Sequence, residues 1–395
     1  MTLGPVRAAA LAAAAAAFLE FEQDRLRYGK AALRLLLRAL VSARVLLQSD
    51  EAGIPRGPVA RGPRPSARLR AFNSVLTGGP VGSYDLRAWR FGMGSGIWGE
   101  VGAEFCAETC GTLARVGGVP GRWFGARDAG WAPRSPRVLY LHGGGFTAGS
   151  PGVYASFCTQ LSRATDARVF AAAYRLAPEH ALPAAVDDAY TAYAALVRME
   201  REGGEGGSGL AGRCRRLVVV GDSAGGGLVV LLLQRIRMRG ELPMPAAAVA
   251  MSPSVGLTAS GAAGSHAQNA RRDQLFRIPG AFALNSAHAV GGDAAKLRDP
   301  ACNGLLAPAA AWARLPPLLV MASECELLRD DAIECAAKAR AGGAAVRLVI
   351  KPHVPHVWPL FLDLFPEARE ALGEISAFVR DEVCAACALG GSSKL

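Results

Sequence analysis

The strongest chemical signal in the chain is a serine flanked by glycines, G-D-S-A-G at residues 221–225. An apolar run at 217–220 precedes this motif, and an apolar helical stretch follows it. A serine exposed on a sharp strand-to-helix turn needs small neighbours two positions away, because bulky side chains would block the strained backbone. The spacing therefore predicts that Ser223 is a nucleophile.

A second glycine-rich motif, H-G-G-G-F at 142–146, directly follows the apolar run 137–141. Consecutive glycines allow backbone N–H groups to approach and point at a ligand. The N–H groups of Gly143, Gly144 and Gly145, together with that of Ala224, are predicted to bind a developing oxyanion. A phosphate-binding loop is the alternative, but the Lys-Ser/Thr pair that such a loop carries is missing here.

The elements that must position these groups follow one another as short apolar runs and helical stretches. Strands are expected at 137–141, 168–173, 217–220, 246–251, 318–321 and 346–350, and helices at 153–164, 183–200, 224–238, 328–341 and 367–382. Such alternation predicts an α/β fold with a mostly parallel sheet covered by helices on both faces. The segment 253–315 is longer than a crossover requires and is expected to form part of a cap.

A series of motifs in this order resembles the hormone-sensitive-lipase group of α/β-hydrolases, which includes microbial esterases. The matching stretches are HGGGF at 142–146, YRLAPE at 174–179, GDSAGG at 221–226, SPSVGLT at 252–258, LPPLLV at 315–320, LLRDDA at 327–332 and HVWPLF at 356–361. The resemblance covers roughly residues 119–382. It implies the α/β-hydrolase fold with a helical cap, and a carboxylic ester hydrolase that works through an acyl-enzyme with neither a metal nor an organic cofactor.

The same resemblance implies a triad of serine, acid and histidine. His356 matches the family histidine, two residues before the aromatic Trp358. Its imidazole is expected to take the proton of Ser223 and return it to the leaving group. His353 is the competing histidine, but it lacks the aromatic residue two positions later.

The family position of the acid falls on Glu326, where the usual residue is Asp. Glutamate serves in other triads of this fold, although the extra methylene requires the loop to compensate. Asp330 and Asp331 are the alternatives, and both are expected to begin the next helix, where carboxylates interact favourably with the helix dipole.

Several further positions are expected to support the site without touching substrate. They are His142, Asp222 and Glu179, with Tyr174, Pro178 and Asp188 holding the neighbouring loop. His180, His266 and His288 are expected to be surface or cap histidines.

Composition limits the other possible functions. The chain has 395 residues, of which 51% are hydrophobic, and a net charge of +11. Residues 1–70 hold 12 Lys and Arg against 5 Asp and Glu, so +7 of that charge lies in this extension. No nucleic-acid-binding module is apparent. The nine cysteines have neither zinc spacing nor an even number, which predicts free thiols and no metal site.

The expected domain organisation has four parts. A basic extension and Pro/Gly-rich linker form 1–70, an N-terminal cap region 71–118, the catalytic domain 119–383 and a flexible tail 384–395. Within the extension, residues 25–48 read as a basic amphipathic helix. Such a helix either contacts a membrane surface or packs on its own domain, and the second interpretation is favoured.

Targeting signals occur near both ends of the chain. The apolar run at 8–19 has twelve residues, too few for a spanning helix and only a minor candidate for a signal peptide. The last residues, Ser393, Lys394 and Leu395, form the peroxisomal import signal. The chain is therefore expected in peroxisomes or a related microbody, where the import receptor would be its partner.

Two other functions fit the same fold. A non-catalytic small-molecule receptor, as in the plant gibberellin receptors, lacks the catalytic histidine that this chain has at His356. An amide hydrolase such as a formamidase would use the same groups. The expected substrate is a small-molecule or lipid ester, whose acyl and alcohol portions depend on cap residues, and no feature predicts an oligomeric state.

Overall fold

The computed structural model describes residues 111–125, 135–202, 213–258, 264–273, 280–362, 364 and 366–389. The basic extension, the linker, the expected helix at 25–48, most of the expected N-terminal cap region and the import signal lie outside the described residues.

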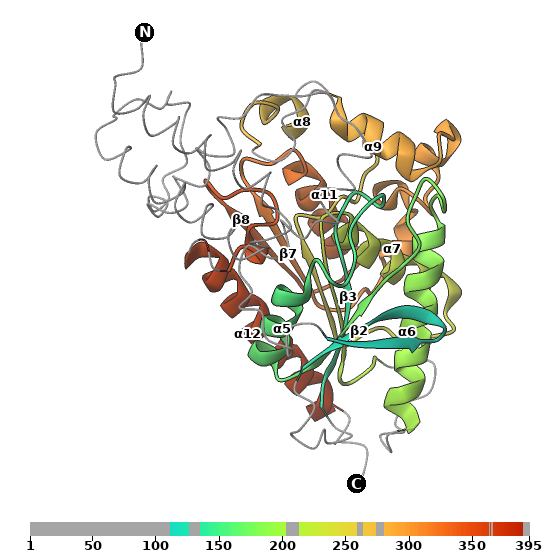
Figure 1. Cartoon of the computed structure of the whole chain (residues 1–395), viewed down its shortest axis with the longest axis vertical. Helices are drawn as coiled ribbons and strands as arrows, with labels where there is room; N and C mark the ends of the chain where they lie inside the picture. Colours follow the sequence, from blue (N-terminus) through green and yellow to red (C-terminus); the bar gives the residue numbers. More distant parts are fainter. Residues whose placement is uncertain are drawn as a thin grey trace, which may run out of the picture.

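One eight-stranded sheet forms the centre of the described chain (Figure 1). Its strands are β1 (Thr112–Val116), β2 (Val119–Phe124), β3 (Arg137–Leu141), β4 (Arg168–Ala172), β5 (Leu217–Asp222), β6 (Ala247–Met251), β7 (Leu318–Ser323) and β8 (Val346–Lys351). The order is β1-β2-β4-β3-β5-β6-β7-β8; β2 is antiparallel to both of its neighbours, β1 and β4, and the other five pairs are parallel. The expected boundary at residue 119 is therefore too late, because β1 belongs to the sheet.

Helices cover both faces of the sheet, as the strand–helix alternation predicts (Figure 1). They are α5 (Ala155–Thr165), α6 (Ala184–Glu202), α7 (Ala224–Arg239), α11 (Arg329–Ala341) and α12 (Pro366–Leu389). Alternate residues of β3 enter two separate cores: Leu139 and Leu141 pack with α6, α7 and α11, whereas Val138 and Tyr140 pack with α5 and α12. The fold is the expected α/β architecture, a mostly parallel sheet with helices on both faces.

The last helix corrects the expected flexible tail at 384–395. Helix α12 continues through Leu389, seven residues beyond the expected end at 382. The stretch from Val383 onward is Val-Cys-Ala-Ala-Cys-Ala-Leu and has no helix breaker before Gly390, and alanine and leucine favour helix strongly. Val383 is buried, and Cys387 packs against the same core. The pair Cys384 and Cys387 thus lies on a helix.

The insertion between β6 and β7 divides into two parts. Helices α8 (Ser265–Gln268) and α9 (Ala281–Ala289) lie over one end of the sheet, followed by the 3-10 turn η2 (Ala294–Arg298) (Figure 1). The turn η3 (Gly304–Leu306) and helix α10 (Ala309–Trp312) instead pack on α7, with Trp312 buried in the core. The expected cap at 253–315 is thus too wide, since its final part belongs to the body.

All cysteines in the described ranges are free thiols. Cys158, Cys214, Cys302, Cys325 and Cys335 are buried, Cys387 is half-buried and Cys384 is exposed. Among the described helices, none combines the length and apolar character that crossing a membrane requires.

Candidate active site

Ser223 occupies a strained turn between β5 and α7. Its backbone has φ 53° and ψ −121°, and its N–H donates to the carbonyl of Met251 on the neighbouring strand at 2.8 Å. A Cβ on Gly225 would lie 1.9 Å from the carbonyl oxygen of Leu141, and one on Gly221 would lie 2.4 Å from that of Gly225. The two glycines of the motif are therefore required by the close approach of three chain segments.

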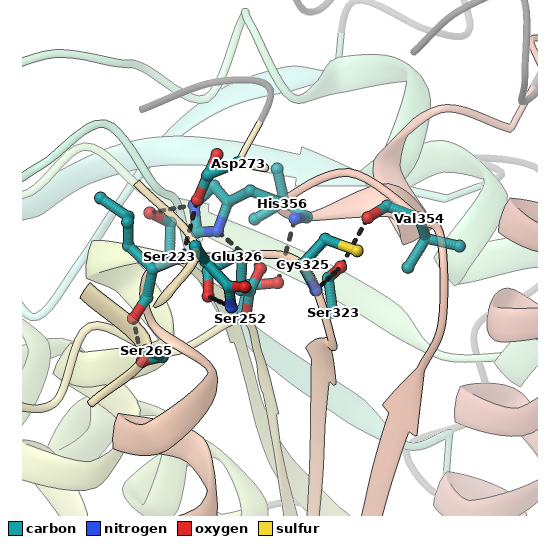
Figure 2. Close-up of polar contacts among 12 residues, drawn as sticks. Ser223, Ser252, Ser265, Asp273, Ser323, Cys325, Glu326, Val354 and His356 are labelled. Atoms are coloured by element: carbon teal, nitrogen blue, oxygen red, sulfur yellow. Dashed lines mark hydrogen bonds and ion pairs between the residues drawn. The ribbon is translucent and has the colours of Figure 1, made fainter. Parts of the chain in front are cut away.

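A chain of hydrogen bonds joins Ser223, His356 and Glu326 (Figure 2). The Oγ of Ser223 lies 2.9 Å from Nε2 of His356, and Nδ1 of the same ring lies 2.9 Å from Oε2 of Glu326. The three groups come from the loops after β5, β8 and β7, whose carboxyl ends meet at one edge of the sheet. The Ser223, Glu326 and His356 side chains are all buried.

Burial and charge act in opposite directions on this pair. Burial raises the pKa of Glu326, and the hydrogen bond from His356 offsets only part of that effect. Burial alone would lower the pKa of His356. The hydrogen bond and charge of Glu326, with the charges of Asp273 and Asp222, outweigh it and raise the pKa of His356 above its ordinary value. The site therefore favours a proton on the imidazole once Ser223 gives one up.

The alternative acids have other partners. Oδ2 of Asp330 accepts a hydrogen bond from the N–H of Ser265 at 2.6 Å, and Oδ2 of Asp331 accepts one from the N–H of Gly256 at 2.8 Å. Both do begin α11, as expected, but they also tie this helix to the loops that follow β6. The carboxylate that reaches the histidine ring is that of Glu326.

Two serines that sequence reasoning missed hold the loop that carries His356 (Figure 2). Oγ of Ser252 accepts a hydrogen bond from the N–H of Val357 at 3.0 Å, and the hydroxyl of Ser323 donates to the carbonyl of Val354. Both serines have fully buried side chains. His353 lies half-buried in the turn before this loop, with φ 62°, and it is His356 that reaches Ser223.

The glycine-rich loop corrects one expectation about the oxyanion site. The N–H of Gly143 donates to Oδ1 of Asp222 at 3.0 Å, so this N–H is already engaged and does not point at a substrate. Gly144 and Gly145 have φ +118° and +64°, a region that favours glycine. In the structure's described residues, the N–H groups of Gly144, Gly145 and Ala224 make no hydrogen bond.

The groups behind this loop include a buried carboxyl group, that of Asp222, and a buried histidine, His142. Asp222 accepts the hydroxyl of Tyr140 at 2.6 Å, and burial raises its pKa to about 6. The ring of His142 stacks between Tyr174 and Tyr154, and burial lowers its pKa to about 4. Since Nδ1 of His142 lies 2.8 Å from the carbonyl oxygen of Gly143, it carries the proton. These side chains support the loop as expected.

The loop after β4 is held partly as expected. The hydroxyl of Tyr174 donates to the carbonyl of His142 at 2.6 Å, and the guanidinium and N–H of Arg175 bind Asp188. Glu179, which was expected to support the site, is exposed on the turn at 177–180.

The cap contributes a contact to the oxyanion loop that no motif indicates. Asn285 of α9 donates from Nδ2 to the carbonyl of Gly145 at 2.9 Å, and its Oδ1 accepts the hydroxyl of Thr147 at 3.0 Å. A Cβ on Gly145 would lie 2.4 Å from Nδ2 of Asn285. Asn285 lies on a helix 140 residues away in sequence, so spacing alone could not have identified it.

Residues 138–360 match the α/β hydrolase fold family. The carboxylesterase/phospholipase LipF of Mycobacterium tuberculosis is 32% identical over 346 residues, which cover 83% of this chain and 85% of that protein. An acetyl-hydrolase of Streptomyces hygroscopicus is 34% identical over 244 residues, covering 62% of this chain and 75% of that protein.

Solved structures agree with these sequence relatives. A hormone-sensitive lipase from a metagenome library has a TM-score of 0.68 and 32% identity, and the match covers 80% of this chain and 98% of that one. The esterase EstE5, solved after soaking with p-nitrophenyl butyrate, has a TM-score of 0.67 and 31% identity over 83% of this chain and 100% of that one. This chain belongs to the α/β hydrolase fold family and, within it, to the carboxylic ester hydrolases that resemble hormone-sensitive lipase.

Proposed function

We propose that the chain hydrolyses carboxylic esters through an acyl-enzyme on Ser223, with His356 as general base and acid and Glu326 as the triad acid. The observation that carries this proposal is the hydrogen-bonded chain from Ser223 through His356 to Glu326, with 2.9 Å at each step. A serine hydroxyl is a weak nucleophile unless an adjacent base takes its proton, and this geometry supplies that base.

In the first half-reaction, Oγ of Ser223 attacks the ester carbonyl carbon while its proton passes to Nε2 of His356. The carbonyl oxygen becomes an oxyanion, which the N–H groups of Gly144, Gly145 and Ala224 are positioned to bind. His356 then gives the proton to the leaving alcohol as the C–O bond breaks. In the second half-reaction, His356 takes a proton from water as the water oxygen attacks the acyl carbon. The bond between that carbon and Oγ of Ser223 then breaks, His356 returns the proton to Oγ, and the carboxylic acid is released.

Removing the nucleophile tests this function. Ser223→Ala should abolish hydrolysis of p-nitrophenyl butyrate while the protein stays folded, because the substitution removes one hydroxyl and leaves the backbone of the turn unchanged. The matched control is Ser376→Ala, since Ser376 is also buried but its hydroxyl donates within α12, to the carbonyl of Gly373. A fluorophosphonate probe should label wild type at Ser223 and leave the variant unlabelled. Normal turnover by folded Ser223→Ala would overturn the proposal.

A comparison of an ester with an amide substrate tests the proposed ester preference. Hydrolysis of p-nitrophenyl acetate and of the matching anilide separates an esterase from an amide hydrolase that uses the same groups. We expect the ester to be strongly preferred, in line with the acetyl-hydrolase and carboxylesterase names of the relatives. Binding of either compound without turnover would instead fit a receptor.

For a chain that ends at Leu395, we propose a peroxisomal location on the basis of Ser393-Lys394-Leu395. A fluorescent protein fused in front of residue 1 should then enter peroxisomes, and removal of the last three residues should leave it in the cytosol. Because the fusion masks any N-terminal signal, untagged protein detected by antibody is the control. Secretion of the untagged protein would contradict this location.

A further inference from the structure

A buried polar face of the cap meets the turn that carries Glu326. Ser265, Asn269 and Asp273 follow one another at intervals of four residues. The N–H of Asn269 donates to the carbonyl of Ser265, and that of Asp273 to the carbonyl of Asn269, each at 2.8 Å. Helical spacing therefore continues beyond α8 and places the three side chains on one side. All three are at most 1% exposed.

These side chains bond to the backbone on both sides of Glu326. Nδ2 of Asn269 donates to the carbonyl oxygens of Glu324 and Glu326, each at 2.9 Å. Oδ2 of Asp273 accepts the N–H of Leu327 at 2.7 Å, and the hydroxyl of Ser265 donates to the carbonyl of Leu327. The carbonyl groups of residues 324, 326 and 327 and the N–H of Leu327 are thus satisfied from the cap.

Within the turn at 324–328, the backbone around Glu326 makes only weak hydrogen bonds to the turn itself. Its internal backbone hydrogen bonds are long, at 3.5 Å from the N–H of Glu326 to Ser323 and 3.4 Å from the N–H of Arg329 to Glu326. Both lie beyond the 2.7–3.2 Å range of well-formed N–H···O bonds, whereas the bonds from Asn269 and Asp273 lie inside it. The N–H groups of Glu324 and Cys325 bind the carbonyl of Lys351 and the hydroxyl of Ser323, each at 3.0 Å. The part of the turn at residues 326 and 327, which carries the Glu326 side chain, is held mainly by the cap segment.

We propose that Asn269 and Asp273 are positioning residues that hold the Glu326 turn so that its carboxylate stays within hydrogen-bonding distance of His356. Figure 2 shows Asp273 beside the His356 ring, so its carboxylate also faces the imidazolium that forms during catalysis. The inference rests on the proposed role of Glu326 as triad acid. A loosening of the turn by 1 Å would lengthen a 2.9 Å contact beyond hydrogen-bonding distance.

A double-mutant cycle tests the proposal. In the wild-type background, Asn269→Ala should lower kcat for p-nitrophenyl butyrate by about ten- to a hundredfold with KM little changed, because a small misplacement of the acid slows the chemical step. In the Glu326→Gln background the same substitution should cost less than about threefold, since the group that it positions has been removed. Gln268→Ala, one residue earlier and exposed, is the matched control and should match wild type.

Asp273→Asn supplies a second variant in case Asn269→Ala fails to fold. Its side-chain oxygen still accepts the N–H of Leu327, but the charge is lost. The carboxylates that raise the pKa of His356 are Glu326, Asp273 and Asp222. Loss of the Asp273 charge should lower the pKa of His356, so the fall of kcat/KM on the acidic side of its pH profile should move to lower pH in this variant. Weaker folding would not produce this change.

The outcomes separate the two proposals. Loss of activity in Glu326→Gln, with equal fold losses for Asn269→Ala in both backgrounds, would overturn the positioning role and leave the triad standing. Wild-type kcat in Asn269→Ala, or an unmoved acidic limb in Asp273→Asn, would also overturn it. Normal activity of Glu326→Gln would overturn the triad acid and the positioning role together.

Discussion

Removing the charge of Glu326 while keeping its shape should slow the enzyme greatly. During attack by Ser223, His356 becomes an imidazolium whose Nδ1 lies 2.9 Å from a carboxylate oxygen. With about 4 Å between the charge centres and an effective dielectric constant of about 20, their attraction is about 4 kcal/mol. Glu326→Gln removes this attraction, which is present in the transition state and absent while the ring is neutral. The expected loss in kcat is about three orders of magnitude.

The assay is kcat and KM for p-nitrophenyl butyrate, with folding checked by thermal unfolding. Glu324→Gln is the matched control, because Glu324 is half-buried in the same turn and should show near-normal kcat. Glu326→Asp keeps the charge but shortens the side chain by about 1.5 Å. The 2.9 Å contact would open beyond hydrogen-bonding distance, so an intermediate loss is expected.

A kcat within a few-fold of wild type in Glu326→Gln would refute this reasoning. So would a large loss in Asp330→Asn or Asp331→Asn, combined with a mild one in Glu326→Gln. Either result would mean that another carboxylate stabilises the imidazolium.

Three more results are expected. His356 must be neutral to act as a base, and its pKa is raised above 6.5. The value of kcat/KM should therefore fall as the pH drops through a midpoint above 6.5, and a midpoint at or below 6.5 would contradict the assignment. Burial raises the pKa of Asp331 to about 7 from 3.8, so the folded state holds a proton that the unfolded chain releases, and stability should decrease as pH rises through this range. Asp331→Asn keeps an acceptor for the N–H of Gly256. It should reduce the pH dependence of the free energy of unfolding by up to about 1.4 kcal/mol per pH unit, as measured by urea unfolding at pH 5 and 8. Asn285→Ala should lower kcat by about tenfold by freeing the carbonyl of Gly145, with wild-type turnover as the contrary outcome.

Much of the site could be predicted because several of its functional residues lie in short sequence motifs. The glycines around Ser223 are needed where strand, turn and helix touch, so local spacing reveals them. The sheet follows from apolar runs, which bury both faces of a parallel strand. Glu326 and His356 were located through resemblance, since each lies more than 100 residues from Ser223.

The remainder depends on contacts between distant segments. The N–H of Gly143 is already bound by the carboxylate of Asp222, which lies 79 residues away in the sequence. The spacing of Ser265, Asn269 and Asp273 could have indicated one polar helical face, but not that the face is buried on the Glu326 turn. The helix at 367–382 was predicted, but its continuation to Leu389 was missed, although the helix propensity of the alanines and leucine after Val383 was visible.

The segments between β6 and β7 hold the oxyanion loop at Gly145 and the acid turn at Glu326, while they also cover the site. A change in the cap of this chain should therefore alter both the substrate preference and the reaction rate. Exchanging the cap with that of a relative, in order to change substrate preference, would transplant the supports of the catalytic groups as well. A successful chimera would have to retain or recreate the asparagine contacts at both places, and grafts chosen only for pocket shape should be folded but slow.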